Sequence, residues 1–277
     1  RLCRIDGASA RGPIAFADIV RLLWLTPAQD GLFTGPAGDR RRFLDRIAQT
    51  HSVGHAKAGA EFETALRQRQ KLLEAGRYDE GWLSAIEAQL AEAAVAVATA
   101  RREAAAILAS FDVSSLAGGA FPSAEIVLEG DLESALEGSP ITDVEDWYQT
   151  ELSRRRPMDA EAGRTTLGPH KSDLVVRYRA KDTLAKHAST GEQKALLIGL
   201  ILANACALAG RAQTTPLVLL FDEIAAHLDP DRRAALFDIL GGLGHQCFMT
   251  GTDDTLFAAW GDRAQGFRVD EGAVTAL

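Results

Sequence analysis

The C-terminal part of the chain alternates between helical and strand-like hydrophobic patterns. Leu174–Tyr178 alternates like a strand, and Leu217–Phe221 is a continuous apolar run, as in strands buried within parallel sheets. Gly191–Leu208 reads as a long helix, Pro230–Leu240 as a helix with proline in its first turn, and Cys247–Thr250 as another short buried strand. Helices that alternate with apolar strands predict an α/β fold, in which helices cover the faces of a sheet.

The middle of the chain follows a different pattern. From Ala56 to Phe111 it is dominated by Ala, Glu, Gln, Leu and Arg, and apolar residues recur every three or four positions. With a joint at Gly76–Asp79, this pattern predicts two helices that pack antiparallel as a protruding arm with a structural role. We therefore expect an α/β head, residues 1–54 and 158–277, interrupted by a mainly helical arm lobe, residues 55–157.

Local signals predict where several shorter elements begin and end. Asp39 is expected to cap a helix that contains three consecutive arginines. Glu125–Glu129 alternates like a strand. A further helix is expected to follow, with Thr142 or Asp143 as its cap and Pro157 as its end.

Composition narrows the class of protein. The hydrophobic fraction of 47% and the charged fraction of 25% are those of an ordinary globular chain of 277 residues. A net charge of -8 argues against a surface that is basic throughout, although it leaves a local basic patch open. Cys3, Cys206 and Cys247 have no zinc-site spacing, and the longest apolar run, Ala195–Ala209, is interrupted by Asn204. We expect a soluble cytoplasmic protein without a membrane partner.

Two acids follow the apolar run Leu217–Phe221. Asp222 and Glu223 stand at its carboxyl end, which is where open α/β sheets bind ligands. In a phosphate-transfer site the first acid can hold Mg²⁺ and the second can orient and deprotonate an attacking water. Asp229 comes seven residues after Asp222 and precedes Pro230, a spacing found in the loop after the Walker B strand of ABC-type ATPases. By itself, Asp229 is only the cap of a helix.

A second motif precedes the long apolar helix. Ser189, Thr190, Gly191, Glu192 and Gln193 resemble the LSGGQ-type signature of ABC-type ATPases. A hydroxyl, a glycine that allows close backbone approach and a helix N-terminus together favour an anion. The alternative is a capping box, in which Ser189 and Glu192 serve helix stability alone. The order of this motif, a helix, an apolar strand ending in Asp-Glu and a Leu-Asp loop favours an ABC-type ATPase head.

Four further blocks make the chain resemble the RecF family of SMC-like ATPases. They are Trp24–Pro27, the stretch Leu32–Asp45, Thr166–Leu174 with its Gly-Pro-His-Lys sequence, and Phe248–Asp253. The resemblance runs from about Leu22 to Asp253, and the helices of the arm match the family in place and kind only. It implies an ATP-dependent DNA-binding protein of gap repair and replication restart, acting at junctions of single-stranded and duplex DNA.

The resemblance also implies a mechanism, in which two heads sandwich two ATP molecules and close on DNA. Ser189 and Gly191 would touch the γ-phosphate of ATP on the partner's P-loop, and Asp229 would cross the interface. Asp222 would hold Mg²⁺ and Glu223 would activate water. The other nucleotide-binding candidates are Thr190, Glu192, Gln193 and Thr250. The implied partners are single-stranded and gapped duplex DNA, a second copy of the chain when ATP is bound, and recombination mediators of the RecO and RecR type that load the recombinase.

Basic residues in two of the blocks are candidates for DNA contacts. These residues are Arg40, Arg41, Arg42, His170 and Lys171. Basic side chains bind phosphates, but a run of charges is more often a solvated face. Pairing of the arginines with Asp39 and Asp45 is the alternative for the first block, and structural hydrogen bonding or a nucleotide contact is the alternative for the second.

The chain departs from its expected family at two places. No GxxxxGK[ST] motif occurs, because Gly35–Gly38 lacks the lysine and Gly191–Lys194 lacks the spacing. Since the family carries this motif near its N-terminus, we expect a segment that contains it to precede Arg1. Thr250 stands where ABC transporters have a histidine, and because threonine is no general base we expect slow hydrolysis. Two alternatives to a RecF-like function stay open: another SMC-like or ABC-type ATPase, or a binding module without catalysis.

Overall fold

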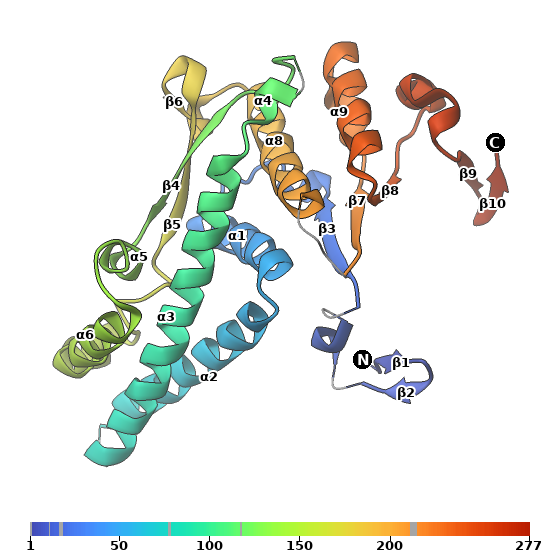
Figure 1. The fold of residues 1–277 in the computed structure, drawn as a ribbon. Helices are drawn as coiled ribbons and strands as arrows, with labels where there is room; N and C mark the ends of the chain where they lie inside the picture. The colour runs from blue at the N-terminus through green and yellow to red at the C-terminus, as the bar shows by residue number, and fades with distance from the viewer. Residues whose placement is uncertain (1, 11, 17–18, 77–78, 117, 211–214) are drawn as a thin grey trace.

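The fold was determined from a computed structural model of the 277 residues. It describes every residue except 1, 11, 17–18, 77–78, 117 and 211–214. A small parallel sheet with its helices forms one side of the molecule, and an antiparallel sheet with long helices forms the other (Figure 1).

The parallel sheet gathers three strands in the order β3 (Arg21–Leu25), β7 (Leu217–Phe221) and β8 (Gln246–Met249). The predicted strand β7 is confirmed with the same bounds, and β8 lies one residue earlier than expected. Leu25, Phe221 and Met249 are in register, so the carboxyl ends of all three strands meet at one edge. The Asp222 amide donates to Leu25 O at 2.9 Å, which fixes the position of the acids.

Helices α8 (Thr190–Ala209) and α9 (Pro230–Leu243) pack against this sheet. By length and mean hydropathy, the stretches Thr190–Ala209 and Glu80–Leu116 are apolar enough to cross a membrane, although neither is an unbroken apolar run. The apolar windows of these stretches are 89% and 56% buried within the protein. Both are thus core helices in this structure.

The parallel sheet buries only part of its apolar surface. Trp24, Leu220 and Phe248 stand opposite one another on its three strands and are 36%, 37% and 54% exposed. Their neighbours on the other face, among them Leu25, Leu219 and Phe221, are buried in the main core. Strands of parallel sheets are usually covered on both sides. Within the described residues, this sheet is covered fully on one face, whereas on the other face Arg46 lies over Trp24 and Leu220 and Phe248 stay exposed.

A second sheet has the order β4 (Ala124–Glu129), β5 (Asp173–Tyr178) and β6 (Thr183–Leu184), with antiparallel pairing. Leu174 and Val176 of β5 point into the same core as the parallel sheet. Although β4 falls within residues 55–157, which are expected to form the arm, it pairs along its whole length with β5 of the head. The short hairpins β1 (Arg4–Ile5) with β2 (Ala8–Ser9) and β9 (Phe267–Asp270) with β10 (Ala273–Ala276) lie near the two ends of the chain.

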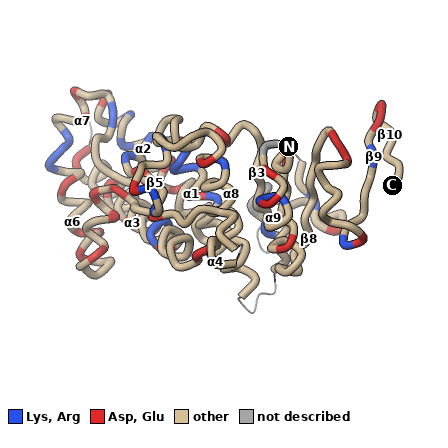
Figure 2. The backbone as a smooth tube through the Cα atoms, turned by 90° about the horizontal axis from the view of Figure 1, so that it is seen from above, with Lys and Arg blue, Asp and Glu red and all other residues tan. Residues whose placement is uncertain are grey.

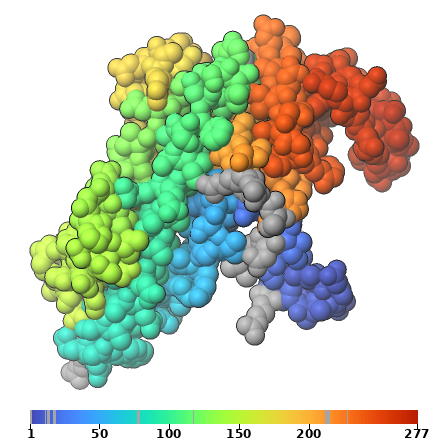
Figure 3. Space-filling view, in the orientation of Figure 1, coloured from blue at the N-terminus to red at the C-terminus, as the bar shows by residue number. Residues whose placement is uncertain are grey.

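The predicted pair of arm helices is α2 (Gly54–Ala75) and α3 (Glu80–Ser110), which lie side by side in opposite directions (Figure 1). Gly76 ends α2 with a φ of 66°, and the Asp79 carboxylate caps α3 by accepting from the Trp82 amide at 2.9 Å. Residues 77–78 of the expected joint lie outside the described part of the chain. The connected end of the two helices projects from the body of the molecule (Figure 3).

Helix α3 takes part in two hydrophobic cores. Its residues Leu83 to Ala98 include Leu90 and Val97 of the arm core, together with Tyr148 and Leu152 of α6 (Ile141–Arg154). Its last turns place Ala104 and Leu108 in the main core below the sheets. One helix thus connects the arm core to the main core.

Two predicted helix caps are wrong. Helix α1 (Ala37–His51) begins after Pro36 rather than at Asp39, and α6 begins after Pro140 rather than at Thr142 or Asp143. Each proline has extended ψ, which places the next residue at the first helical position without a side-chain cap. Pro157 lies in the first turn of α7 (Arg156–Ala162), so the chain becomes helical again where an end was expected.

The arm contains a buried ion network centred on Arg69, whose side chain is fully enclosed. Its Nε donates to Glu87 Oε1 at 2.9 Å, and its Nη1 donates to Asp159 Oδ2 at 2.7 Å and Thr165 Oγ1 at 2.8 Å. Its Nη2 donates to Leu152 O at 2.7 Å. Each nitrogen of this guanidinium therefore donates a hydrogen bond. The network holds together α2, α3, α6, α7 and the loop that follows α7.

Candidate functional site

The two predicted catalytic acids lie at the carboxyl end of β7 and are exposed. Thr250, at the end of β8, donates from its hydroxyl to Asp222 Oδ1 at 2.5 Å and accepts from the Glu223 amide at 3.3 Å. Glu223 has a φ of 52°, in the left-handed region that non-glycine residues rarely occupy. The turn thus directs two carboxylates to the edge at which ligands of open α/β sheets bind.

The donor set at this edge suits Mg²⁺. Mg²⁺ prefers hard oxygen ligands, and it is usually held by one or two carboxylates with waters and phosphates completing the shell. Asp222 supplies a carboxylate, and the hydroxyl of Thr250 fixes one of its oxygens. The described residues contain no cluster of three or more His, Cys, Asp or Glu side chains that could hold a metal alone. A site at Asp222 would therefore depend on phosphate oxygens.

The signature-like motif forms the N-terminus of α8. Ser189 and Glu192 form the capping box that was the structural alternative for this motif: the Glu192 amide donates to Ser189 Oγ at 3.4 Å and the Ser189 amide donates to Glu192 Oε2 at 2.9 Å. Lys181 pairs with Glu192, and this ion pair, with the bonds from Ser189, lowers the pKa of Glu192 to about 2. Ser189 and Thr190 are exposed, so the cap leaves them accessible.

In the second half of the motif, the backbone of Gly191 is accessible, whereas the side chains of Gln193 and Lys194 are held by contacts within the fold. A Cβ added to the exposed Gly191 would meet nothing within 4 Å, so an approaching group has free access to its backbone. Gln193 is buried, and its Nε2 donates to Ala188 O at 2.8 Å. The ammonium group of Lys194 lies 3.0 Å from Asp30 Oδ2, which ties the first turn of α8 to the loop after β3.

Asp229 is the N-cap of α9, as expected. Its Oδ1 accepts from the Arg232 amide at 2.9 Å, and Pro230 occupies the first turn. Arg232 is fixed in turn by a bond of 3.0 Å from its Nε to Ala120 O. Asp229 is exposed, so it is placed at the surface together with Asp222 and Glu223 on the preceding turn.

The three consecutive arginines of α1 have different surroundings. Arg40 forms a two-fold ion pair with Asp173, with Nε to Oδ1 at 2.7 Å and Nη2 to Oδ2 at 2.8 Å, and this pairing raises its pKa. Arg42 pairs with Asp39, which was one of the partners expected for this cluster. Arg41 donates from Nη1 to Ser172 O at 2.7 Å. Arg40 thus has a structural partner 133 residues away, which no local pattern in the sequence indicates.

The Gly-Pro-His-Lys block forms a fixed loop before β5. Gly168 has a φ of 136°, and a Cβ at this position would lie 2.4 Å from the Tyr148 hydroxyl, so only glycine fits. The Tyr148 hydroxyl donates to Leu167 O at 2.8 Å. His170 Nε2 donates to Thr165 O at 2.9 Å, and burial lowers the pKa of His170, which favours its neutral form. The structural alternative for His170 is thus realised.

Other contacts around this loop were not expected from sequence. Arg101 of α3 donates from Nη1 to Pro169 O at 2.5 Å and forms a two-fold pair with Asp45, at 2.8 and 2.9 Å. His55 lies 2.9 Å from the same carboxylate. Burial opposes ionisation of Asp45, but the bonds from His55 and Arg101 outweigh it and lower its pKa to about 2. The carboxylate of Asp45 is therefore bound by His55 and Arg101 and forms no ion pair with Arg40, Arg41 or Arg42.

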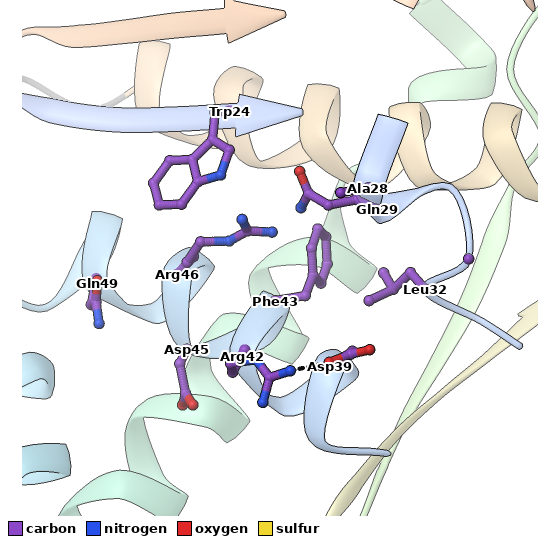
Figure 4. A pocket seen from close by; sticks show the side chains of 11 residues that line it. Trp24, Ala28, Gln29, Leu32, Asp39, Arg42, Phe43, Asp45, Arg46 and Gln49 are labelled. Atoms are coloured by element: carbon purple, nitrogen blue, oxygen red, sulfur yellow. Dashed lines mark hydrogen bonds and ion pairs between the residues drawn. The ribbon is translucent and has the colours of Figure 1, made fainter. Parts of the chain in front are cut away.

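A cavity of about 610 Å³ lies between β3 and α1 (Figure 4). The Arg46 guanidinium is stacked 4.5 Å from the centre of the Trp24 ring and 5.8 Å from that of Phe43, and burial lowers its pKa. None of the residues predicted to bind nucleotide or metal lines this cavity. It is thus separate from the acids at the end of β7.

Comparisons with known proteins agree with these features. No protein-family model matches the chain. The DNA replication and repair protein RecF of Rhizobium etli (strain CIAT 652) is 49% identical over 274 residues, which cover 99% of this chain and 73% of that protein. The protein of the same name from Mesorhizobium japonicum is 49% identical over 274 residues, with 99% and 72% covered.

Two solved structures have a similar fold over almost the whole chain. The recombination mediator protein RecF-ATP in the RecFOR pathway matches 99% of this chain with a TM-score of 0.81, and RecF-ATPrS matches 100% with a TM-score of 0.80. Each match covers 73% of the solved chain at 19% sequence identity, which establishes the ABC-type head fold alone. With relatives near half identity over almost the whole sequence, the resemblance drawn from the motifs is confirmed. The chain belongs to the RecF family.

Proposed function

We propose that this protein acts in DNA replication and repair as an ATP-dependent DNA-binding protein. The observation that carries the proposal is the constellation at the carboxyl end of β7, where Thr250 links Asp222 and Glu223 by hydrogen bonds. It occurs in a chain about half identical to proteins named for DNA replication and repair. Structural relatives are named as RecF with ATP, which supports ATP as the nucleotide.

The geometry supports a division of labour among the candidate residues. Asp222 would hold Mg²⁺, which neutralises charge on the phosphates when bound. Glu223, exposed beside it, orients and deprotonates the attacking water. The Thr250 hydroxyl fixes the carboxylate of Asp222 but does not accept a proton at neutral pH, so we propose slow hydrolysis. ATP then acts chiefly as a clamp between subunits.

The clamp joins two copies of the chain. Ser189 and Gly191 offer an exposed hydroxyl and an open backbone at the N-terminus of α8, where the helix dipole favours an anion. Each copy presents this end to the γ-phosphate of ATP held by the other copy, and Asp229 lies at the same interface. Thr190, Glu192 and Gln193 complete the turn and support its geometry.

The proposed substrate of the clamp is DNA with a junction between single and double strands. The RecFOR pathway in the names of the structural relatives supports mediators of the RecO and RecR type as partners, and recombinase loading as the outcome. We place the protein in the cytoplasm, where bacterial DNA and ATP are found. The division into head, residues 1–54 and 158–277, and arm, residues 55–157, remains our proposal, with α3 common to both cores.

The test is ATP-dependent dimerisation of the protein expressed from its natural gene, measured by light scattering with ATP and Mg²⁺. Glu223→Gln should trap the dimer after ATP is added, and Ser189→Arg should prevent it. Glu271→Gln is the control for the first, since Glu271 is also exposed with positive φ, and Ser139→Arg at an exposed turn is the control for the second.

Binding to gapped duplex, single-stranded and blunt duplex DNA is measured on the same samples. Gapped DNA should bind most tightly, and only with ATP present. Dimerisation unaffected by both Glu223→Gln and Ser189→Arg would show the sandwich to be wrong. A protein that binds DNA equally with and without ATP would be a binding module without catalysis.

A further inference from the structure

The loop that joins α7 to β5 is held by bonds to three helices. The Thr166 amide and hydroxyl donate to Asp159 Oδ1 at 3.0 and 2.7 Å, and Arg101 and Tyr148 bond to the carbonyls of Pro169 and Leu167. These contacts fix the backbone from one end of the loop to the other. The exposed side chains of this loop therefore project from a backbone that is already fixed before any ligand binds.

Two cations project from the base of this loop. The bond from His170 Nε2 to Thr165 O, 2.9 Å, brings the residues on either side of the loop together, namely Arg164 and Lys171. Both side chains are exposed. Burial and the neighbouring charge of Arg164 lower the pKa of Lys171, which agrees with the closeness of the two groups.

A third cation reaches the same place from α1. The bond from Arg41 Nη1 to Ser172 O, 2.7 Å, holds this guanidinium against the residue that follows Lys171. Burial and the charge of Arg101 lower the pKa of Arg41, and the charge of Arg41 contributes to lowering that of Lys171. The three cations come from two segments far apart in sequence, α1 and the α7–β5 loop, and the fold gathers them in one region.

No carboxylate of the described residues forms an ion pair with Arg41, Arg164 or Lys171. The contrast with their neighbours is clear, because Arg40 is paired with Asp173 and Arg42 with Asp39. These three cations lack an ionic partner although the protein has an excess of acidic residues and a net charge of -8. In the half of the molecule that holds α1, α2 and α7, Lys and Arg are frequent and lie among Asp and Glu (Figure 2). Adjacent unpaired cations repel one another, and a bound anion relieves that repulsion.

We propose that Arg41, Arg164 and Lys171 form a site for the backbone phosphates of a nucleic acid, a proposal that rests on the proposed function. Arg164 and Lys171 are exposed and Arg41 is half-buried at the surface, an open arrangement that suits a chain of phosphates better than a small phosphate ligand. Their elements, α1 and the α7–β5 loop, are different from those that carry the nucleotide candidates on α8, β7 and β8. Contacts of this kind position a duplex and read no base sequence.

The experiment measures DNA affinity against salt concentration for the natural protein and for Arg164→Gln with Lys171→Gln. Neither side chain makes a hydrogen bond or ion pair within the described residues, so folding is expected to be unaffected. Each lost phosphate contact reduces the slope of log affinity against log salt by about 1. We expect the double variant to lose about two units of slope and on the order of tenfold or more in affinity at low salt, equally for unrelated sequences.

Arg4→Gln with Lys71→Gln is the matched control, since both residues are exposed cations elsewhere on the chain. The control should keep the slope of the wild type. A double variant that keeps the slope, while the wild type still binds DNA and dimerises with ATP, would overturn the phosphate site and leave the proposed function standing. A wild type that binds no DNA at any salt concentration would overturn both. A defect confined to binding of anionic phosphatidylglycerol vesicles would assign the cluster to membranes instead.

Discussion

Thr250 Oγ1 donates a hydrogen bond of 2.5 Å to Asp222 Oδ1, and this bond joins the ends of two neighbouring parallel strands. The same hydroxyl accepts from the Glu223 amide at 3.3 Å, so one small side chain orients the whole acidic turn. The hydroxyl therefore fixes the carboxylate of Asp222 and the backbone of Glu223.

Replacing Thr250 by valine removes the hydroxyl and keeps the shape of the side chain. Loss of a side chain that orients a metal ligand typically lowers activity about 10- to 100-fold. We expect Thr250→Val to lower Mg²⁺-dependent ATP hydrolysis by that factor in single-turnover experiments, and Thr250→Ser to stay close to wild type. Equal rates for the valine and serine variants would show that the hydrogen bond has no part in the reaction.

Ser189→Asp separates the two interpretations of the signature-like motif. Aspartate caps a helix about as well as serine, so the thermal unfolding temperature should not change. The added carboxylate would repel the negatively charged γ-phosphate, so Ser189→Asp should nevertheless abolish dimerisation with ATP, as measured by light scattering. Ser139→Asp controls for the added charge. If Ser189→Asp still dimerises, the motif is only a capping box.

Arg69→Met is expected to be among the most destabilising single substitutions in the arm. It leaves Asp159 buried without an ionic partner while Glu87 keeps Arg156, and breaking a buried pair in this way costs about 3–5 kcal/mol. Urea unfolding followed by circular dichroism measures the loss. Arg67→Met, two residues away on the exposed side of α2, is expected to change the free energy of unfolding by about 0.5 kcal/mol or less. Similar values for the two variants would contradict the network's role.

Glu133 gives a prediction about pH. It is buried, its two oxygens have no hydrogen-bond partner of ordinary geometry among the described residues, and burial raises its pKa above 4.5. The unfolded chain then releases this proton first, so the residue's effect on the free energy of unfolding becomes unfavourable as pH rises above 4.5. Glu133→Gln should be more stable than wild type at pH 7, and the difference should shrink toward pH 4.5.

The control for Glu133→Gln is Glu137→Gln, which changes an exposed residue of the same region. It should leave stability unchanged across the pH range in chemical denaturation. A constant difference between Glu133→Gln and wild type from pH 4.5 to 7 would mean that the acid is neutral throughout, or that its charge is compensated in the fold.

Sequence patterns predicted the elements that depend on local signals. The apolar run of β7 is present as expected, and the capping box of Ser189 and Glu192 is present as the alternative described it, because side-chain periodicity and capping act over a few residues. The caps of α1 and α6 were predicted wrongly, since Pro36 and Pro140 set the backbone of the first turn without a side-chain bond. A Ser, Thr or Asp close to a helix start is therefore a weaker signal when a proline precedes it.

Contacts between distant segments had no signal in the sequence. Arg40 was grouped with Arg41 and Arg42, yet it alone forms a two-fold pair with Asp173. Arg164 was not predicted as a site residue, although it stands just before the Thr166–Leu174 block that was identified. Which arginine of a cluster remains unpaired depends on the tertiary fold, and only coordinates distinguish them.

The 31 residues of α3 run without interruption from the tip of the arm into the main core. At 1.5 Å per residue this is a rod of about 46 Å. Because this helix is stiff and packs in both cores, a tilt at the end of the arm is expected to displace its last turns beneath the sheets. A displacement of the tip is therefore expected to change the packing of Ala104 and Leu108 beneath the sheets.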